Sequence, residues 1–414
     1  MEGPRFRGPG RRRSVRNRRA VTPSLLHCDR HLAKNGRLLC VATLTPFPVN
    51  LRPALPGFLL LAALVVASRS PAAAASGGAH TFKRGVNISH WLSQNIPAQP
   101  YAAPWFDEED VAWIAAQGFD HIRYPIDGRV WRRADGTLDE SKIAPFVRAL
   151  AWTKAHGLGA ILDMHFLPGA SFDPDDQQAA AFTDEKLQEQ VADFWARVAK
   201  RFAGEGDYVR FEVLNEPVAP KNELLNAFNR RMLAAIRQSN PTRVVYLTSN
   251  RWSSFSTVGD VEVPADPRVA ITVHFYEPML FTHQRAAWAR LPANLPAIHF
   301  PGRVPDLTGF VPRDHFAFRA AGSELTVKEV DAAFDTVAAW AAKSAPGREI
   351  YLGEFGVYVP ADAKSKRNYI GAIMANTARL GWSWAVWDYQ DSFGVRDAAG
   401  RGTPILEGLF PAKK

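Results

Sequence analysis

Cysteine is nearly absent from this chain of 414 residues, which contains only Cys28 and Cys40. Residues 80–414 have none, so disulfide bonds and cysteine-ligated metals are excluded there. Stability must then come from a hydrophobic core, which a chain of about 335 residues can bury. His27 and His31 lie near the two cysteines, but their spacing matches no standard zinc motif. We therefore expect neither a metal nor a cofactor.

The short motifs of several enzyme classes are also missing. The sequence has no G-x-S-x-G nucleophile elbow, no Walker phosphate loop, no H-E-x-x-H zinc motif and no Rossmann glycine fingerprint. Esterases, nucleotide-binding enzymes and zinc proteases therefore lack their usual signals. The apolar run at residues 58–67 has ten residues. A stable membrane span needs about 20, so none is expected.

The formal charge of +9 is concentrated in the N-terminal part of the chain. Residues 1–79 hold 13 of the 50 Lys and Arg but only 2 of the 41 Asp and Glu, which leaves 37 basic and 39 acidic residues in 80–414. Because the larger part is close to neutral, a nucleic-acid backbone is not its expected partner. A neutral or sugar-like ligand fits it better.

Residues 49–79 have the layout of a secretory signal peptide. Arg52 gives a positive start, residues 58–67 form the apolar region, and the alanines at 72–75 suit a cleavage site. Export is therefore expected, and with it a secreted or periplasmic location. Because signal peptides begin at the N-terminus, we expect translation to start near the first residue of this segment and residues 1–48 to be a non-native extension. A disordered basic arm remains the alternative for that extension.

From Thr81 onward, short apolar runs alternate with amphipathic segments, as is typical of α/β proteins. Strands are expected at 82–88, 121–126, 159–165, 209–215, 243–249, 269–275, 349–355 and 382–389. Helices are expected at 106–118, 139–156, 184–202, 222–238, 326–343, 365–380 and 403–410, so only the connection from the fifth to the sixth strand lacks one. These repeats predict a (β/α)8 TIM barrel that forms a single catalytic domain over residues 80–414. A doubly wound open sheet is the alternative, but no glycine-rich phosphate loop follows the first strand.

The carboxyl ends of the strands in such a barrel face one common pocket. In the stretch R-F-E-V-L-N-E-P-V, residues 210–218, an apolar run delivers Asn215 and Glu216 to a strand end, and Pro217 stops the pattern. The other strand ends supply Arg123, His165, His274, Tyr276, Glu354 and Trp387. Each residue alone is explained by capping or core packing. Their coincidence at matching strand positions indicates a functional site.

Two carboxylates on different strands, without a metal-ligand cluster, are typical of enzymes that cleave glycosidic bonds. One acid must stay protonated to supply the leaving oxygen, and the other must stay ionised to attack the anomeric carbon. Arg123 and Tyr276 are suited to stabilise an ionised carboxylate. Asn215 can hydrogen-bond a sugar hydroxyl, and the indole of Trp387 offers an apolar face to a pyranose ring.

These motifs resemble glycoside hydrolase family 5, the cellulase family, over roughly residues 80–410. L-N-E-P at 214–217 is similar to the acid/base motif of the family, and G-E-F-G at 353–356 is similar to its nucleophile motif. The resemblance implies that Glu216 is the general acid/base and Glu354 the nucleophile of a retaining reaction, with the two carboxyl groups about 5–5.5 Å apart. It also implies substrate-binding roles for residues in I-R-Y-P-I, D-M-H, N-E-P, V-H-F-Y-E-P and W-A-V-W-D-Y, namely Arg123, His165, Asn215, His274, Tyr276 and Trp387.

The resemblance implies a polysaccharide or oligosaccharide substrate and leaves its linkage open. We expect an endo-β-1,4-glucanase, because this is the commonest bacterial activity of the family and R-G-V-N-I-S-H-W at 84–91 resembles the opening strand of its cellulases. We also expect the protein to be a monomer. The alternatives are a β-1,3-glucanase, a β-mannanase, a xyloglucanase and, in a different class, an inactive carbohydrate-binding barrel. His90 and Trp91 are expected to line the cleft, unless Trp91 belongs to the core. The long loop at 279–325 is expected to lie over the site, where it would add sugar subsites or close one end.

Overall fold

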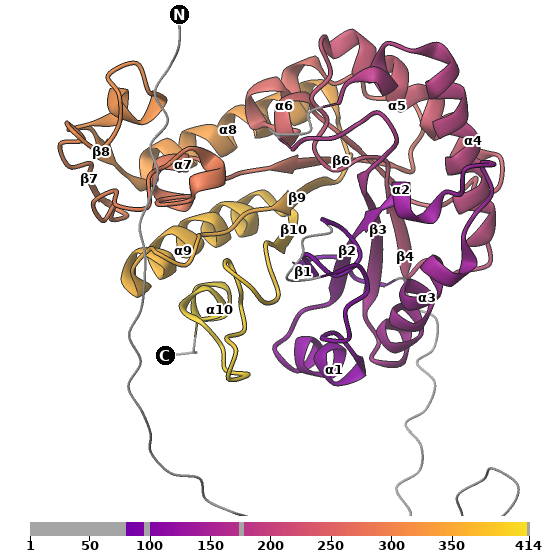
Figure 1. Cartoon of the computed structure of the whole chain (residues 1–414), viewed down its shortest axis with the longest axis horizontal. Helices are drawn as coiled ribbons and strands as arrows, with labels where there is room; N and C mark the ends of the chain where they lie inside the picture. The colour runs from indigo at the N-terminus through magenta and orange to yellow at the C-terminus, as the bar shows by residue number, and fades with distance from the viewer. Residues whose placement is uncertain (1–79, 95–99, 174–177, 412–414) are drawn as a thin grey trace, which may run out of the picture. The chain divides into compact units, whose positions relative to one another are not determined.

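The computed structural model describes residues 80–94, 100–173 and 178–411 (Figure 1). The expectations for residues 1–48 and 49–79 therefore lie outside the described residues. Eight parallel strands close into a barrel in the order β1-β10-β9-β6-β5-β4-β3-β2. Their bounds are Arg84–Asn87 (β1), His121–Asp127 (β2), Gly159–Phe166 (β3), Val209–Glu212 (β4), Val245–Thr248 (β5), Val269–His274 (β6), Ile350–Glu354 (β9) and Ser383–Val386 (β10). The predicted (β/α)8 barrel is confirmed.

The helices occupy the connections in which the sequence predicts them. Their bounds are Glu108–Ala116 (α1), Gly128–Trp131 (α2), Glu140–Ala155 (α3), Glu185–Arg201 (α4), Asn222–Arg237 (α5), Asn250–Ser253 (α6), Val327–Ser344 (α8), Ala363–Leu380 (α9) and Pro404–Leu409 (α10). Acidic or hydroxyl side chains cap several of their N-termini, as Asp107 does for α1 in a capping box. The connection from β5 to β6 holds only the short α6 and a 3-10 helix, η2 (Phe255–Asp260), as expected. Among the described residues, none of these helices has both the length and the apolar character needed to cross a membrane.

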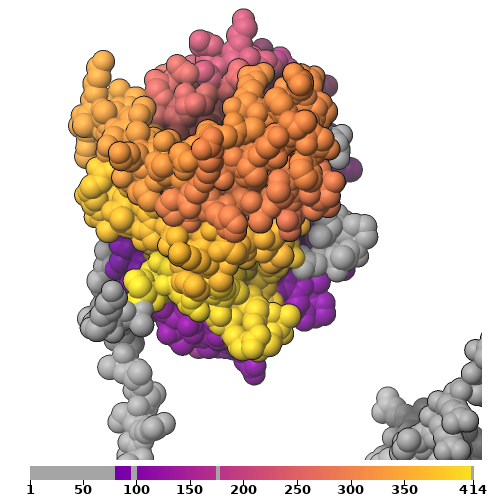
Figure 2. All heavy atoms as spheres, turned by 90° about the vertical axis from the view of Figure 1, so that its left-hand side faces the viewer, coloured from indigo at the N-terminus to yellow at the C-terminus, as the bar shows by residue number. Residues whose placement is uncertain are grey.

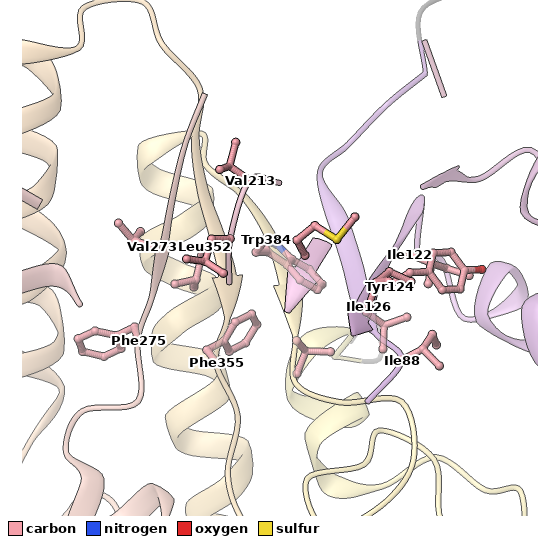
Figure 3. Packing of buried hydrophobic residues seen from close by; sticks show 14 of the residues in the cluster. Ile88, Ile122, Tyr124, Ile126, Val213, Val273, Phe275, Leu352, Phe355 and Trp384 are labelled. Carbon is pink, nitrogen blue, oxygen red and sulfur yellow. The ribbon is translucent and has the colours of Figure 1, made fainter. Parts of the chain in front are cut away.

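Side-chain alternation along the strands separates the helix-facing core from the barrel interior. Ile122, Tyr124 and Ile126 are buried and lie together beside β2 (Figure 3). Tyr124 packs edge-on against Phe146 of α3, with 5.5 Å between the ring centroids. Because successive side chains of a strand point to opposite faces, Arg123 is directed into the barrel. Because Ile122 and Tyr124 are buried against the helices, the side chain of Arg123 between them must point into the barrel.

The long segment after β6 divides into two parts. Its elements are α7 (Met279–Thr282), η3 (Ala287–Ala289), β7 (Gly302–Arg303), η4 (Phe316–Ala320) and β8 (Glu324–Leu325). The later part packs against α9: Phe300 lies 5.3 Å from Tyr369 between ring centroids, and His299 bonds Asp362 at 2.8 Å. Figure 2 views the face on which the orange residues of this segment adjoin the yellow C-terminal residues. The first part reaches the carboxyl ends of the strands, where His283 lies 5.0 Å from Tyr276 between ring centroids. For the later part, the expectation that this segment lies over the site stays a prediction.

Candidate active site

All eight residues singled out from the sequence meet at the carboxyl ends of the barrel strands. A continuous set of contacts joins them. They are Arg123, His165, Asn215, Glu216, His274, Tyr276, Glu354 and Trp387. The strand β4 ends at Glu212, three residues earlier than expected, so Asn215 and Glu216 lie on the segment that follows it.

Two carboxylates form the centre of the site. Glu216 follows β4 and Glu354 ends β9, and a carboxylate oxygen of each lies within 4.8 Å of the other. Inverting glycosidases keep their carboxyl groups about 6.5–9.5 Å apart to admit a water, whereas retaining ones keep them about 5–5.5 Å apart. The short spacing therefore suits direct attack by one carboxylate on a sugar held between them.

Glu354 is surrounded by hydrogen-bond donors. Arg123 Nη1 donates to its Oε1 at 2.8 Å, and the hydroxyl of Tyr276 donates to its Oε2 at 3.0 Å. Burial raises the pKa of Glu354, and the Arg123 guanidinium opposes that rise by favouring the ionised form. The donors aimed at both oxygens favour the charged form of this carboxylate against the effect of burial.

Glu216 lies in a different electrostatic environment. Nδ1 of His274 lies 2.8 Å from its Oε1 and fixes the orientation of the carboxyl group. Burial, and next the negative charge of Glu354, raise the pKa of Glu216 well above its ordinary value. Burial also lowers the pKa of His274 well below its ordinary value, so the imidazole is neutral. The protonated form is therefore favoured more strongly at Glu216 than at Glu354.

Arg123 is the hub of a buried hydrogen-bond network that sequence reasoning only partly foresaw. Its five N–H groups make five hydrogen bonds of 2.8 Å: two to Glu212 and one each to Asn87, Asn215 and Glu354. Glu212 and Asn87 were missed, although Glu212 stands inside the apolar run that was read as a strand. A charged residue in such a run has to be paired when it is buried, and that rule could have identified it.

Asp163 is a second acid that the sequence reading missed, in A-I-L-D-M-H. Its Oδ2 lies 3.1 Å from Arg123 Nη2 and 2.8 Å from His165 Nδ1. Burial raises the pKa of Asp163 to about 7, opposed by Arg123. Burial lowers the pKa of His165 to about 3. The contact with Asp163 holds the ring of His165 so that its Nε2 faces Asn215 Nδ2 at 3.5 Å. This separation is long for a hydrogen bond, so the amide group of Asn215 keeps donor capacity for a ligand.

Trp387 forms one wall of the site. Its ring stacks on His165 at 8° with 5.6 Å between centroids, and His90 meets it edge-on at 6.3 Å. Trp91, by contrast, is 3% exposed and packs against Phe106 in the core. Of the two expected cleft residues, His90 therefore lies beside the site, and Trp91 follows its core alternative.

Among the residues that the structure describes, two groups have a spacing that could hold a metal ion. One is Glu216 with His274 and Glu354, and the other is His90 with Asp388 and Asp391. The first group is already engaged in hydrogen bonds with Arg123 and Tyr276 and between its own members. The arrangement of donors around Glu354 suits a free carboxylate.

The fold and the site together define a class of enzyme. A parallel (β/α)8 barrel with two close carboxyl groups at its carboxyl edge, one beside neutral His274 and the other beside Arg123, has the architecture of a retaining glycoside hydrolase. The chain belongs to glycosyl hydrolase family 5, the cellulase family, whose model matches residues 84–392.

Known proteins of two kinds are similar to this chain. Endoglucanase C of Acetivibrio thermocellus is 30% identical over 315 residues, which cover 75% of this chain and 92% of that enzyme. Cellodextrinase A of Ruminococcus flavefaciens is 28% identical over 295 residues, which cover 70% of this chain and 80% of that enzyme. The crystal structure of endoglucanase Cel5A from Thermotoga maritima has the same fold, with a TM-score of 0.65 at 24% identity, and the match covers 79% of this chain and 97% of that one.

Proposed function

We propose that this protein is a retaining endo-β-1,4-glucanase in which Glu216 is the general acid/base and Glu354 the nucleophile. The single observation that carries the assignment is the close pair of carboxyl groups in unlike environments, Glu354 beside Arg123 and Glu216 beside neutral His274. The names of its curated relatives, endoglucanase C and cellodextrinase A, favour a β-1,4-glucan as substrate.

In the first step, the carboxyl proton of Glu216 passes to the glycosidic oxygen as the bond to the anomeric carbon breaks. The carboxylate of Glu354 attacks that carbon and forms a glycosyl ester, and the shortened chain leaves as an alcohol. The other polar groups assist this step. Asn215 donates to a hydroxyl of the sugar, and Trp387 supports its apolar face.

The second step follows from the coupling of the two acids. The ester removes the negative charge of Glu354, which is one of the causes that raise the pKa of Glu216. Glu216, now ionised, has a lower pKa than before and can take a proton from water. That water attacks the anomeric carbon, the ester bond to Glu354 breaks, and the product keeps the original configuration.

The linkage is tested with carboxymethylcellulose, laminarin, mannan and xyloglucan supplied in parallel to the purified protein. Cleavage of carboxymethylcellulose with a rapid fall in viscosity, and with products of several lengths, supports an endo-β-1,4-glucanase. Preference for laminarin, mannan or xyloglucan would transfer the assignment to the corresponding activity. If the protein cleaves none of these glycans, the alternative of an inactive carbohydrate-binding barrel is favoured.

A further inference from the structure

Trp288 is a large apolar side chain in an exposed position. It belongs to η3 and is 58% exposed. The rings of His283, Tyr358 and Phe393 meet it at 79°, 81° and 47°. In residues 80–94, 100–173 and 178–411, no other aromatic ring stacks parallel on this indole. A flat apolar surface is thus held in place by neighbouring rings and left open to solvent.

Two ring contacts connect Trp288 to the nucleophile. The centroid of its ring lies 5.0 Å from that of His283, which in turn lies 5.0 Å from that of Tyr276. Tyr276 donates its hydroxyl to Glu354 at 3.0 Å. Phe393 joins the same cluster, at 6.2 Å from Tyr276. The exposed indole is therefore an extension of the active site and no isolated surface residue.

The support beneath Trp288 is built from three of the loops at the carboxyl ends of the strands. His283 follows β6, Tyr358 follows β9 and Phe393 follows β10. The backbone N–H of Tyr358 donates to the carbonyl of Thr282 at 2.8 Å, which ties the β9 loop to α7. His283 and Phe393 are buried, and Tyr358 is half-buried. Side chains locked by packing of this kind position a binding residue well.

We propose that Trp288 is the platform of a distal β-glucan subsite, on which a sugar of the bound chain stacks beyond the residues next to the scissile bond. This inference rests on the proposed function, because the occupant is the glucan chain that continues from the catalytic site. Indole rings are amphipathic, with a broad apolar face and one polar N–H, and the C–H face of a β-linked pyranose is complementary to that surface.

A protein partner fits this surface less well than a sugar. Exposed patches that dock proteins extend over several hundred Å² of contiguous apolar area. Here the ring neighbours of Trp288 are buried or half-buried, so the indole is the exposed aromatic ring of this cluster. One flat ring beside a catalytic centre matches the dimensions of a single sugar.

The subsite is tested by the length dependence of hydrolysis. Trp288→Ala, Trp288→Tyr and the control Phe316→Ala, which removes another exposed ring of the same segment, are compared with the wild type on cellotriose through cellohexaose. For Trp288→Ala we expect kcat/KM on cellohexaose to fall about tenfold, with less than a twofold change on cellotriose. Trp288→Tyr should recover most of the loss, and Phe316→Ala should match the wild type on every length.

A binding measurement separates this inference from the proposed function. Each change is combined with Glu354→Ala, and the Kd for cellohexaose is measured by calorimetry, with melting temperatures to verify folding. An equal Kd with and without Trp288, or an equal loss of kcat/KM on short and long oligomers, would overturn the subsite. If the wild type cleaves only another β-glucan, the proposed linkage fails, and the same comparison with oligomers of that glycan decides the role of Trp288.

Discussion

Both carboxylate oxygens of Glu212 accept hydrogen bonds of 2.8 Å from Arg123, and neither side chain is exposed to solvent. Such a two-pronged pair fixes the plane of the guanidinium. The remaining N–H groups of Arg123 are thereby aimed at Asn87, Asn215 and Glu354. Glu212 does not contact Glu354 through a hydrogen bond of its own, but it positions Arg123, which contacts the proposed nucleophile, and balances part of the charge of that guanidinium.

Replacing Glu212 by Gln should alter the acidic limb of the pH profile. The change removes a negative charge, so the field of Arg123 on Glu354 becomes stronger and the pKa of Glu354 falls. Because the reaction requires ionised Glu354, the acidic limb of kcat/KM should move to lower pH, while the plateau falls at least about tenfold as the pair is disrupted. The free energy of unfolding should fall by about 3 kcal/mol, the cost of breaking a buried ion pair.

The control for that change is Glu223→Gln, at an exposed position of α5. It should leave the rate, the pH limb and the unfolding midpoint unchanged. If Glu212→Gln lowers the plateau of kcat/KM but leaves the acidic limb at the same pH, the role of Glu212 is structural only.

Replacing Tyr276 by Phe should move the same limb in the opposite direction. The hydroxyl of Tyr276 donates to Glu354 and favours its ionised form. Without that bond the pKa of Glu354 rises, so the acidic limb of kcat/KM moves to higher pH. The plateau should fall about tenfold, as expected for one hydrogen bond to a charged group. Tyr208→Phe, just before β4 and so at the opposite end of the barrel, serves as the control; an unchanged limb in Tyr276→Phe would contradict the assignment.

The sequence alone allowed the fold to be predicted in most of its parts. Apolar runs placed all eight strands, and the amphipathic segments between them placed the long helices to within a few residues. The strand ends also brought the eight candidate residues to one place, because parallel strands in a barrel share a carboxyl edge.

Such patterns do not predict which buried charged residues pair with each other. Glu212 was counted within an apolar run, and Asp163 within another, because periodicity does not reveal which buried charge faces which partner across the barrel. The packing of Phe300 against α9 was missed for a similar reason. A long loop with several prolines has no periodic pattern, so its sequence does not indicate which helix or strand it packs against.

The two acids should be distinguishable by azide rescue. In Glu216→Ala, an activated dinitrophenyl glycoside needs little proton donation, so its first step survives and azide completes the second with a product of retained configuration. In Glu354→Ala, azide attacks from the vacated face and gives the inverted configuration. The loss on natural glucan in Glu216→Ala should be roughly 10²–10⁴-fold. Opposite azide stereochemistry in the two variants would reverse the roles.

The N-terminal segment makes a prediction about processing. We expect export, with mature protein that begins between Ala73 and His80 and contains no cysteine. N-terminal sequencing and intact mass of the exported protein measure this directly. Recovery of the sequence M-E-G-P-R-F at its N-terminus would contradict both the signal peptide and the proposed start of translation.

The central claim is that Glu354 forms a covalent bond to the sugar. The most direct test is incubation with a 2-deoxy-2-fluoro-β-cellobioside that has a dinitrophenolate leaving group, followed by peptide mass spectrometry. The fluorine slows both steps, and the good leaving group speeds only the first, so the intermediate accumulates. We predict one fluorocellobiosyl group per chain, attached to Glu354. Attachment to another residue, or turnover with inversion and no adduct, would contradict the account.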